Sequence, residues 1–193
     1  MKKAHPRLVP LISILTVIVI GTVTASNQIA KTTVTALPQT TAGGAAATFD
    51  MNGVISSLVL GIPPNTKAVD MTTVQKFVLS GDWSINVNQG KLTNFKASFY
   101  TGPVNGGTSN HTHQLSNFRV SNDSSLIHLT PDKTVSISGI ADVGTNYKKA
   151  WNDVNATVVI SKGRTISINL DDQGTQRHFM GQQIYGIVKK INI

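Results

Sequence analysis

Two histidines one residue apart, His111 and His113, are the residues whose type and spacing best suit chemistry in this chain. They lie in NHTHQLSNF, residues 110–118, directly after a glycine-containing loop. On a β-strand, residues i and i+2 point to the same side, so both imidazoles could chelate one cation. Imidazole suits zinc, copper, nickel and iron. The pair therefore predicts half of a transition-metal site, and such a site needs at least one further ligand.

The remaining candidates for that ligand come from distant parts of the sequence. His128 in SSLIHLT and His178 in QRHFMGQ are the other histidines beyond the N-terminal region. Met180 follows two residues after His178 and carries a soft thioether that favours copper. Asp171 and Asp172 could supply oxygen. The predicted metal ligands are therefore His111 and His113 with His128 or His178, and the predicted ion is copper or zinc.

A purely structural interpretation of the same residues stays open. In it His111 belongs to a loop, His113 caps a strand and His178 hydrogen-bonds a turn, with no metal involved. The neighbours of the pair, Asn110, Thr112 and Gln114, are poor ligands and favour neither interpretation.

The motifs of common enzyme classes are missing. There is no G-x-S-x-G nucleophile elbow and neither of the glycine-rich phosphate-binding motifs. The adjacent Asp171 and Asp172 lie in an expected turn, which suits solvated carboxylates better than a glycosidase pair. Cysteine is absent, which excludes disulfides, thiolate zinc sites and cysteine nucleophiles. We therefore expect a non-catalytic protein.

The N-terminus has the pattern of an export address. The basic start MKKAHPR precedes an uncharged apolar run at residues 8–25, and this pattern is typical of a signal peptide or signal anchor within residues 1–30. A Thr/Ala/Gly-rich segment, residues 31–48, follows and predicts a flexible tether. We expect one apolar helix followed by a domain outside the cytoplasm, either anchored in the cell membrane by a single span or secreted.

The charge sets limits on the partners. The formal net charge is +8, and without Lys2, Lys3 and Arg7 it comes from 14 basic and 9 acidic residues. The basic residues are scattered, and no nucleic-acid-binding motif is present, so a nucleic-acid partner is not expected. An envelope protein or a glycan remains a possible partner of such a surface.

Residues 49–193 show short alternating segments separated by turn signals. The chain has no glutamate and is rich in Thr, Val, Ser and Asn, which favours strands over helices. Trp83, Ile85 and Val87 share one face, and Gln89-Gly90 supplies a tight turn. We predict an all-β domain, an antiparallel sandwich or barrel of eight or nine strands.

Three local features are more specific. Leu92 and Phe95 are three residues apart, so a β-bulge near Thr93-Asn94 is needed to bring both to the core. KLTNFKAS at 91–98 is repeated as QLSNFRVS at 114–121, and a symmetric antiparallel register would place Phe95 opposite Phe118. Between residues 160 and 166, a three-residue hairpin loop with Gly163 in the left-handed region would align the apolar faces.

Three blocks of the sequence resemble those of a group of proteins. GDWSINVNQGKLTNFKASF, NHTHQLSNF and LDDQGTQRHFMGQQIYGIV are similar to uncharacterised exported, membrane-anchored β-domain proteins of ammonia-oxidising archaea. The resemblance covers most of residues 75–190 and none of the tether. It implies an extracytoplasmic β-domain on a cell whose surface chemistry depends on copper, and it thereby favours a metal at His111, His113 and His178.

Three functional hypotheses follow. The first is an exported, membrane-tethered binding module that holds copper or zinc through His111 and His113. The second is a structural or adhesive component of the cell envelope without a metal. The third is a carrier of a small ligand, if the strands close into a barrel with an open mouth.

Overall fold

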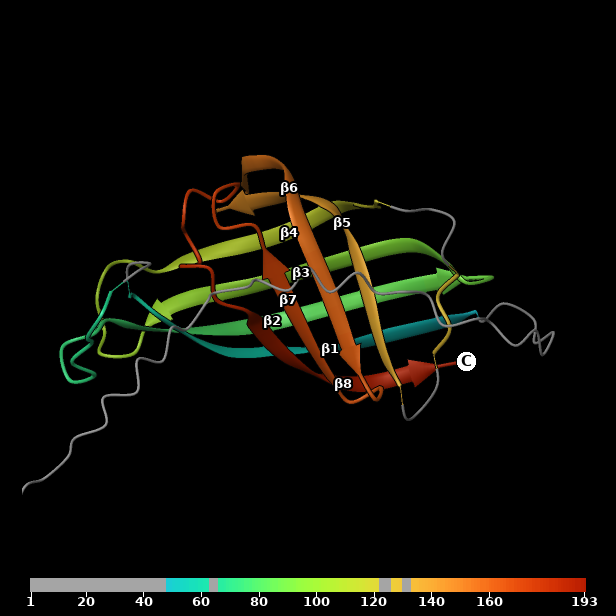
Figure 1. Cartoon of the computed structure of the whole chain (residues 1–193), viewed down its shortest axis with the longest axis horizontal. Coiled ribbons are helices and arrows are strands. Elements are labelled where there is room, and N and C mark those ends of the chain that lie inside the picture. The colour runs from blue at the N-terminus through green and yellow to red at the C-terminus, as the bar shows by residue number, and fades with distance from the viewer. Residues whose placement is uncertain (1–47, 63–65, 122–125, 130–132) are drawn as a thin grey trace, which may run out of the picture. The chain divides into compact units, whose positions relative to one another are not determined.

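The computed structural model describes residues 48–62, 66–121, 126–129 and 133–193 (Figure 1). The predicted apolar helix of residues 1–30 and all but the last residue of the predicted tether lie outside these residues. Every described residue belongs to the compact unit Gly43–Ile193. Its regular elements are all strands, and none of the described segments forms a helix that is long and apolar enough to cross a membrane.

Eight antiparallel strands close into one barrel, and each strand pairs with its neighbour in the sequence. The ring is completed by β8, which pairs antiparallel with β1. The prediction of an all-β antiparallel domain with eight or nine strands is confirmed, with a closed barrel of eight strands. The strands are β1 (Phe49–Leu60), β2 (Lys76–Asn88), β3 (Lys91–Pro103), β4 (His111–Val120), β5 (Thr134–Thr145), β6 (Lys148–Ser161), β7 (Thr165–Leu170) and β8 (Ile184–Asn192).

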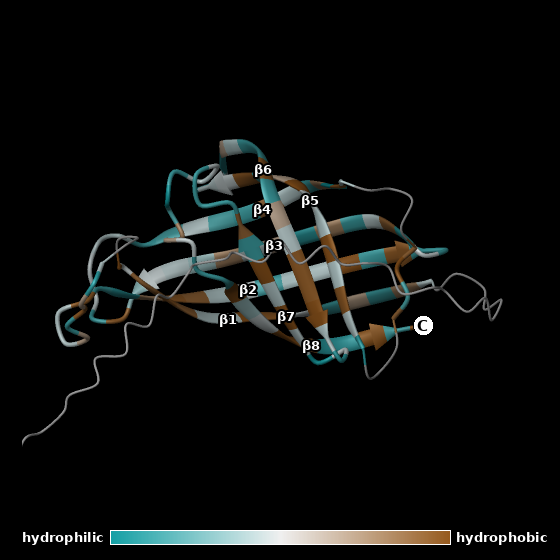
Figure 2. Cartoon of the chain, viewed as in Figure 1, coloured by the Kyte–Doolittle hydropathy of each residue, from teal (hydrophilic) through white to brown (hydrophobic). Residues whose placement is uncertain are grey.

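The alternation of polar and apolar residues places one face of each strand inside the barrel. Trp83, Ile85 and Val87 are at most 2% exposed, as their shared face predicts. Figure 2 shows the same alternation as hydrophobic and hydrophilic bands along the strands. Aromatic side chains from β2 and β3, including Phe95 and Phe99, fill the interior. The barrel therefore has a packed core, as expected for a ring of eight strands.

The hairpin that joins β2 and β3 follows the prediction. Gln89 and Gly90 form its two-residue turn, with φ values of 49° and 75°, and two positive φ values are the mark of a type I′ turn. Asn86 pairs with Asn94 and Val87 pairs with Leu92, so Thr93 is the additional residue of a bulge. The bulge turns Phe95 into the core, where it is 2% exposed.

The predicted register of β3 and β4 is wrong by one residue. Ala97 pairs with Leu115 and Phe99 pairs with His113, so Phe95 is not directly opposite Phe118. The connection between the paired residues Thr101 and His111 contains an odd number of residues, 102–110, whereas the predicted register needs an even number. Beyond the Ala97–Leu115 pair, β4 also has a bulge opposite β5, where Asn117 adopts a left-handed φ of 51°. The Phe95 and Phe118 rings still meet edge to face, with centroids 5.4 Å apart. Such a pair contributes about 1 kcal/mol beyond the area that it buries.

The loop between β6 and β7 is the predicted three-residue hairpin. Ser161 pairs with Thr165, which leaves Lys162, Gly163 and Arg164 in the loop. Gly163 has a φ of 60°, and Lys162 has a φ of 52°. This odd-length loop turns the apolar faces of both strands into the core, as predicted. The buried residues are Val154, Ala156, Val158 and Ile160 of β6 and Ile166, Ile168 and Leu170 of β7.

Two glycines allow β1 and β8 to close the ring. A Cβ on Gly53 would lie 1.9 Å from the carbonyl oxygen of Ile187 and 2.7 Å from the indole nitrogen of Trp83. A Cβ on Gly186 would lie 2.4 Å from the carbonyl oxygen of Val54. The indole of Trp83 covers this seam and donates a hydrogen bond to the Ile187 carbonyl at 3.3 Å. Close backbone approach of this kind needs glycine.

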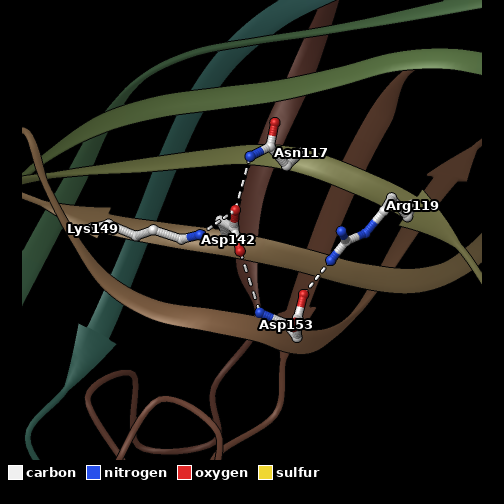
Figure 3. A network of polar contacts seen from close by, with 5 residues as sticks. All are labelled: Asn117, Arg119, Asp142, Lys149 and Asp153. Carbon is white, nitrogen blue, oxygen red and sulfur yellow. Dashed lines mark hydrogen bonds and ion pairs between the residues drawn. The ribbon is translucent and has the colours of Figure 1, made fainter.

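A polar network holds the bulges of β4 and β6 together (Figure 3). Asp142, which is 6% exposed, accepts hydrogen bonds from the Asn117 side chain at 2.8 Å and the Asp153 backbone N–H at 3.3 Å. Its carboxylate also forms an ion pair with Lys149 at 2.9 Å, and Arg119 pairs with Asp153. The bonds from Lys149 and Asn117 lower the Asp142 pKa to about 2. Asn117 and Asp153 both have a φ of 51°, so the network stabilises two left-handed backbone positions.

One end of the barrel is formed by the connections that follow the odd-numbered strands (Figure 1). The described residues of these connections are 61–62 and 66–75, 104–110, 146–147 and 171–183. We call this end the mouth. Because β4 begins there, the mouth carries His111 and His113.

Candidate metal centre

The first two histidines come from the start of β4. His111 pairs with Thr101 and His113 pairs with Phe99 across the β3–β4 ladder. His113 is 0% exposed, and its ring lies 5.3 Å from that of Phe99. The predicted i, i+2 relationship is confirmed, because the two imidazole rings lie on the same side of β4 and meet edge to face, with centroids 4.6 Å apart.

The turn between β5 and β6 holds this part of β4 in place. Asn146 accepts a hydrogen bond from the Thr112 N–H through its side chain at 3.1 Å, and its own N–H donates to the Thr112 carbonyl at 2.9 Å. Asn146 and Tyr147 both have left-handed φ values, 50° and 63°. The backbone between the two histidines is therefore tied to the neighbouring turn.

The third histidine, His178, lies in the connection between β7 and β8. Two buried residues anchor this connection. Thr175, 0% exposed, donates through its hydroxyl to the Asp171 carbonyl at 2.9 Å, and Phe179 packs against Phe99 with ring centroids 6.2 Å apart. Gln182 adds two hydrogen bonds to the backbone of Leu60, at 3.0 Å and 2.6 Å.

The backbone around His178 is unusual. Gln176, Arg177 and Met180 have φ values of 51°, 63° and 53°. Non-glycine residues in the left-handed region cost about 1 kcal/mol or more each and persist where the surrounding contacts enforce them. The anchored connection therefore imposes a specific backbone path that presents His178 to the mouth of the barrel.

The Nε2 atoms of the three histidines converge. His178 Nε2 lies 3.1 Å from His111 Nε2 and 3.1 Å from His113 Nε2. The three ligand atoms all lie within 4.8 Å of one another. In a tetrahedral zinc site with Zn–N bonds of about 2.0–2.1 Å, ligand nitrogens are separated by roughly 3.3 Å. The two separations from His178 are close to this value, and the third is bounded by 4.8 Å, so the group could hold one ion.

The other ring nitrogens fix the tautomers of two of these histidines. His111 Nδ1 lies 2.8 Å from the Ser109 carbonyl, and His113 Nδ1 lies 3.3 Å from the Gly144 carbonyl. A carbonyl only accepts, so each Nδ1 carries the proton and donates it. Each Nε2 then has a free lone pair, which is the form that binds a metal. Thr145 Oγ1, 3.2 Å from His113 Nδ1, adds a second partner.

With these tautomers, the three Nε2 atoms cannot all form hydrogen bonds with one another. If His111 and His113 are neutral with protonated Nδ1, their Nε2 atoms only accept. His178 Nε2 is close to both but can donate at most one proton. At least one of the two 3.1 Å contacts therefore lacks a hydrogen, and the Nε2 lone pair of that histidine has no donor. A cation between the three nitrogens would accept such lone pairs.

Aromatic side chains surround the imidazoles and shift their titration. Burial above all, and then the nearby His178 and His111, lower the His113 pKa to about 3, against the opposing bond to the Gly144 carbonyl. The His178 pKa is also lowered, by burial of its ring and then by His111. Trp151 packs on the His178 ring with centroids 5.2 Å apart. The lowered pKa values favour neutral imidazoles, which are the metal-binding form.

A cavity of about 330 Å³ adjoins the histidines at the mouth of the barrel. His111, His113 and His178 are among the residues that line it. Its other polar residues are Thr101, Gln176 and Arg177, and its apolar wall consists of Val59, Phe77, Leu79, Phe179 and Met180. An ion at the three histidines would therefore have room for an additional ligand.

The structure decides between the two predicted third ligands. His178 joins His111 and His113, whereas His128 lies at the opposite end of the barrel. The N–H of its neighbour Ile127 donates to the carbonyl of Gly90, in the turn between β2 and β3. Because Gly90 and His111 are at opposite ends of the β3 hairpins, His128 is not part of this group.

The other predicted ligands have different positions. Asp171 accepts a hydrogen bond from the Gly174 N–H at 2.6 Å and stabilises a turn. Neither Asp171 nor Asp172 belongs to the three-residue group. Met180 lines the adjacent cavity. The sequence did not reveal that Thr101 pairs with His111 and lines the cavity, or that the Gly144 carbonyl is the partner of His113 Nδ1. Both depend on the pairing of β4 with β3 and β5.

No family model matches the chain, and no curated protein or solved structure matches it. The fold and the site nevertheless define a class of protein. The chain contains a closed eight-stranded antiparallel β-barrel whose mouth carries a three-histidine group that could bind a metal ion.

Proposed function

We propose that this domain is a metal-binding module that holds one transition-metal ion, copper or zinc, on the Nε2 atoms of His111, His113 and His178. The observation that carries the proposal is the convergence of these atoms, with 3.1 Å separations from His178 to each partner. The carbonyl partners of His111 Nδ1 and His113 Nδ1 support it, because they prepare both Nε2 atoms for coordination.

The ligand chemistry favours copper or zinc. Three imidazoles without a carboxylate are unsuited to magnesium or calcium, which prefer oxygen. Three histidines with an open fourth position are a known zinc arrangement, and copper binds nitrogen sites more tightly than the other divalent first-row metals. The thioether of Met180 in the wall of the cavity adds a soft donor near the site, which favours copper.

The proposal includes a location outside the cytoplasm. The basic start and the apolar run at residues 8–25 support export, with the barrel tethered to the membrane or released. The resemblance to exported archaeal β-domain proteins supports the same location. Alkaline phosphatase fused after residue 48 would be active only if the N-terminal segment is exported, and an inactive fusion would contradict this part of the proposal.

Calorimetric titration of the purified chain with Zn²⁺ and with Cu²⁺ tests the metal site. We expect one ion per wild-type chain and no specific binding by the His111→Ala/His113→Ala double variant. His128→Ala is the matched control, since it removes one histidine at the other end of the barrel, and it should bind as the wild type does. Equal heats from the wild type and the double variant would contradict the proposal.

The ligand-carrier hypothesis receives less support. Trp83, Phe95 and Phe99 are each 2% exposed inside the barrel and occupy the space that an enclosed ligand would need. The cavity at the mouth lies beside the histidines, so a ligand there would bind next to the metal rather than inside the barrel.

A second candidate function, an adhesive envelope component, draws on a different feature. A groove of about 540 Å³ combines polar and apolar residues of β2, β3 and β4, among them Lys96, Ser98 and Gln114 beside Trp83, Ala97 and Leu115. Cosedimentation of the chain with purified envelope in the presence of EDTA would favour this candidate. The Ser98→Trp variant, whose larger side chain fills the groove, should then fail to cosediment. Cosedimentation that EDTA prevents would favour the metal-binding module.

A further inference from the structure

Thr101 is a buried polar residue without a partner beside the three histidines. It is 6% exposed, and within the described part of the chain its Oγ1 atom has no hydrogen-bond partner. Thr101 lies directly opposite His111 on the inner face of the β3–β4 ladder and lines the cavity at the mouth. Leaving a buried hydroxyl unpaired costs about 1–3 kcal/mol, so this position favours a ligand that supplies the missing partner.

The charge of the cavity favours an anion. Arg177 lines it, and none of the described residues around it is acidic. A divalent ion on three neutral imidazoles would add two positive charges without a protein carboxylate to compensate them. An anionic ligand at the open position would neutralise part of this charge.

The remaining walls of the cavity favour a compact apolar body on that ligand. Phe77, Leu79 and Phe179 line it together with Val59 and Met180. Its volume of about 330 Å³ is near the lower end of the roughly 300–1,000 Å³ typical of small-molecule sites. The space suits a small organic molecule and is too small for a polymer.

We propose that the mouth cavity binds a small organic carboxylate with an apolar body, whose carboxylate completes the coordination of the metal and accepts a hydrogen bond from Thr101 Oγ1. This inference rests on the proposed metal site and adds the chemical class of its exchangeable ligand. Arg177 attracts the anion, and the apolar wall holds its body.

A titration of the Co²⁺-loaded chain with benzoate tests the inference. Co²⁺ replaces Zn²⁺ because the filled d shell of zinc gives no visible spectrum. We expect benzoate to change the Co²⁺ absorption bands saturably and to bind at least tenfold more tightly than acetate, which lacks the apolar body. No spectral change at high benzoate concentration, or equal affinity for acetate and benzoate, would overturn the inference.

Substitutions at Thr101 separate its role from that of the metal ligands. Thr101→Val keeps the shape and removes the hydroxyl, so it should weaken benzoate binding about tenfold and leave Co²⁺ affinity unchanged. Thr101→Ser should retain benzoate binding. If Thr101→Val does not fold, Arg177→Asn, at an exposed left-handed position that asparagine tolerates, should weaken benzoate binding with unchanged Co²⁺ affinity. Unchanged benzoate affinity in the variant that folds would contradict the proposal.

The two proposals fail in distinguishable ways. If the wild-type chain binds no Co²⁺, Zn²⁺ or Cu²⁺, the metal site itself is wrong and the ligand inference fails with it. If the chain binds metal through the three histidines and benzoate has no effect, only the ligand inference is wrong.

Discussion

The Nε2 atoms of His113 and His178 lie 3.1 Å apart, although 65 positions separate the two residues in the sequence. One belongs to a strand in the barrel wall and the other to the long connection between β7 and β8. A metal ion between them would join this connection to β4. The free energy of metal binding would then help to hold the β7–β8 connection against the barrel. Metal binding should therefore stabilise this part of the fold.

Removal of His178 tests the contribution of the connection. His178→Ala should weaken Zn²⁺ binding at least ~100-fold, because even the loss of an outer partner of a metal ligand costs 10–100-fold. The barrel itself should remain folded, since His178 is exposed whereas His113 is buried. Competition with a chromophoric chelator measures the affinity. Wild-type affinity in His178→Ala would show that this histidine is not a ligand.

Metal binding should raise the thermal stability of the chain. At a free metal concentration of 100 times Kd, a ligand that binds only the folded state stabilises it by about 2.7 kcal/mol. For a domain of this size we expect Tm to rise by roughly 5–10 °C, and EDTA should reverse the change. Differential scanning calorimetry measures it, with His128→Ala as a control that keeps the full shift. An equal Tm with metal and with EDTA would contradict this prediction.

The barrel itself was largely predictable from the sequence. Alternation assigned the buried faces, and the three-residue spacing of Leu92 and Phe95 revealed the bulge at Thr93. The β3–β4 register was not predictable to one residue. It depends on whether the connection between β3 and β4 holds an odd or an even number of residues, and the glycine-containing segment 102–110 does not reveal where pairing begins.

The complete metal site was not predictable, for a topological reason. In an antiparallel barrel, alternate connections lie at opposite ends, so the choice between His128 and His178 depends on counting the strands correctly. A count of eight or nine strands leaves the end of each connection undetermined. The unpaired hydroxyl of Thr101 and the adjacent cavity depend on side-chain packing, which periodicity does not describe.

Substitution of Gly53 should destabilise the barrel where its ends meet. In Gly53→Ala the new methyl group would lie 1.9 Å from the Ile187 carbonyl oxygen and 2.7 Å from the Trp83 indole nitrogen. We expect a loss of at least ~2 kcal/mol in the free energy of unfolding, since β1, β8 and Trp83 would all have to shift. Urea denaturation followed by Trp fluorescence measures the loss.

Gly61→Ala is the control for this substitution. Its nearest contact would be the Cβ of Gln75 at 3.3 Å, which requires only a small movement. Equal stabilities of Gly53→Ala and Gly61→Ala would contradict the assignment of Gly53 to the closing seam.

The Asp142 network should contribute stability that depends on pH. Bonds from Lys149 and Asn117 lower the Asp142 pKa to about 2 in the folded state, below the value of about 3.9 for an unfolded aspartate. The contribution is therefore complete above about pH 4 and is lost as the pH falls through the folded pKa. Because Lys149 is half exposed, we expect about 1 kcal/mol.

Comparison of the wild type with Asp142→Asn isolates this contribution. The difference between their free energies of unfolding, measured in urea with EDTA present, should be constant at neutral pH and decrease between about pH 4 and about pH 2. A difference that does not change over this range would show that the carboxylate has no stabilising charge interaction.

X-ray absorption spectroscopy of the chain loaded with one equivalent of Zn²⁺ tests the central claim most directly. The expected spectrum contains three imidazole nitrogens and one further light atom at about 2.0–2.1 Å, with loss of one imidazole in His178→Ala and no change in His128→Ala. A first shell with fewer than three imidazoles in the wild type, or an unchanged spectrum in His178→Ala, would contradict the three-histidine centre.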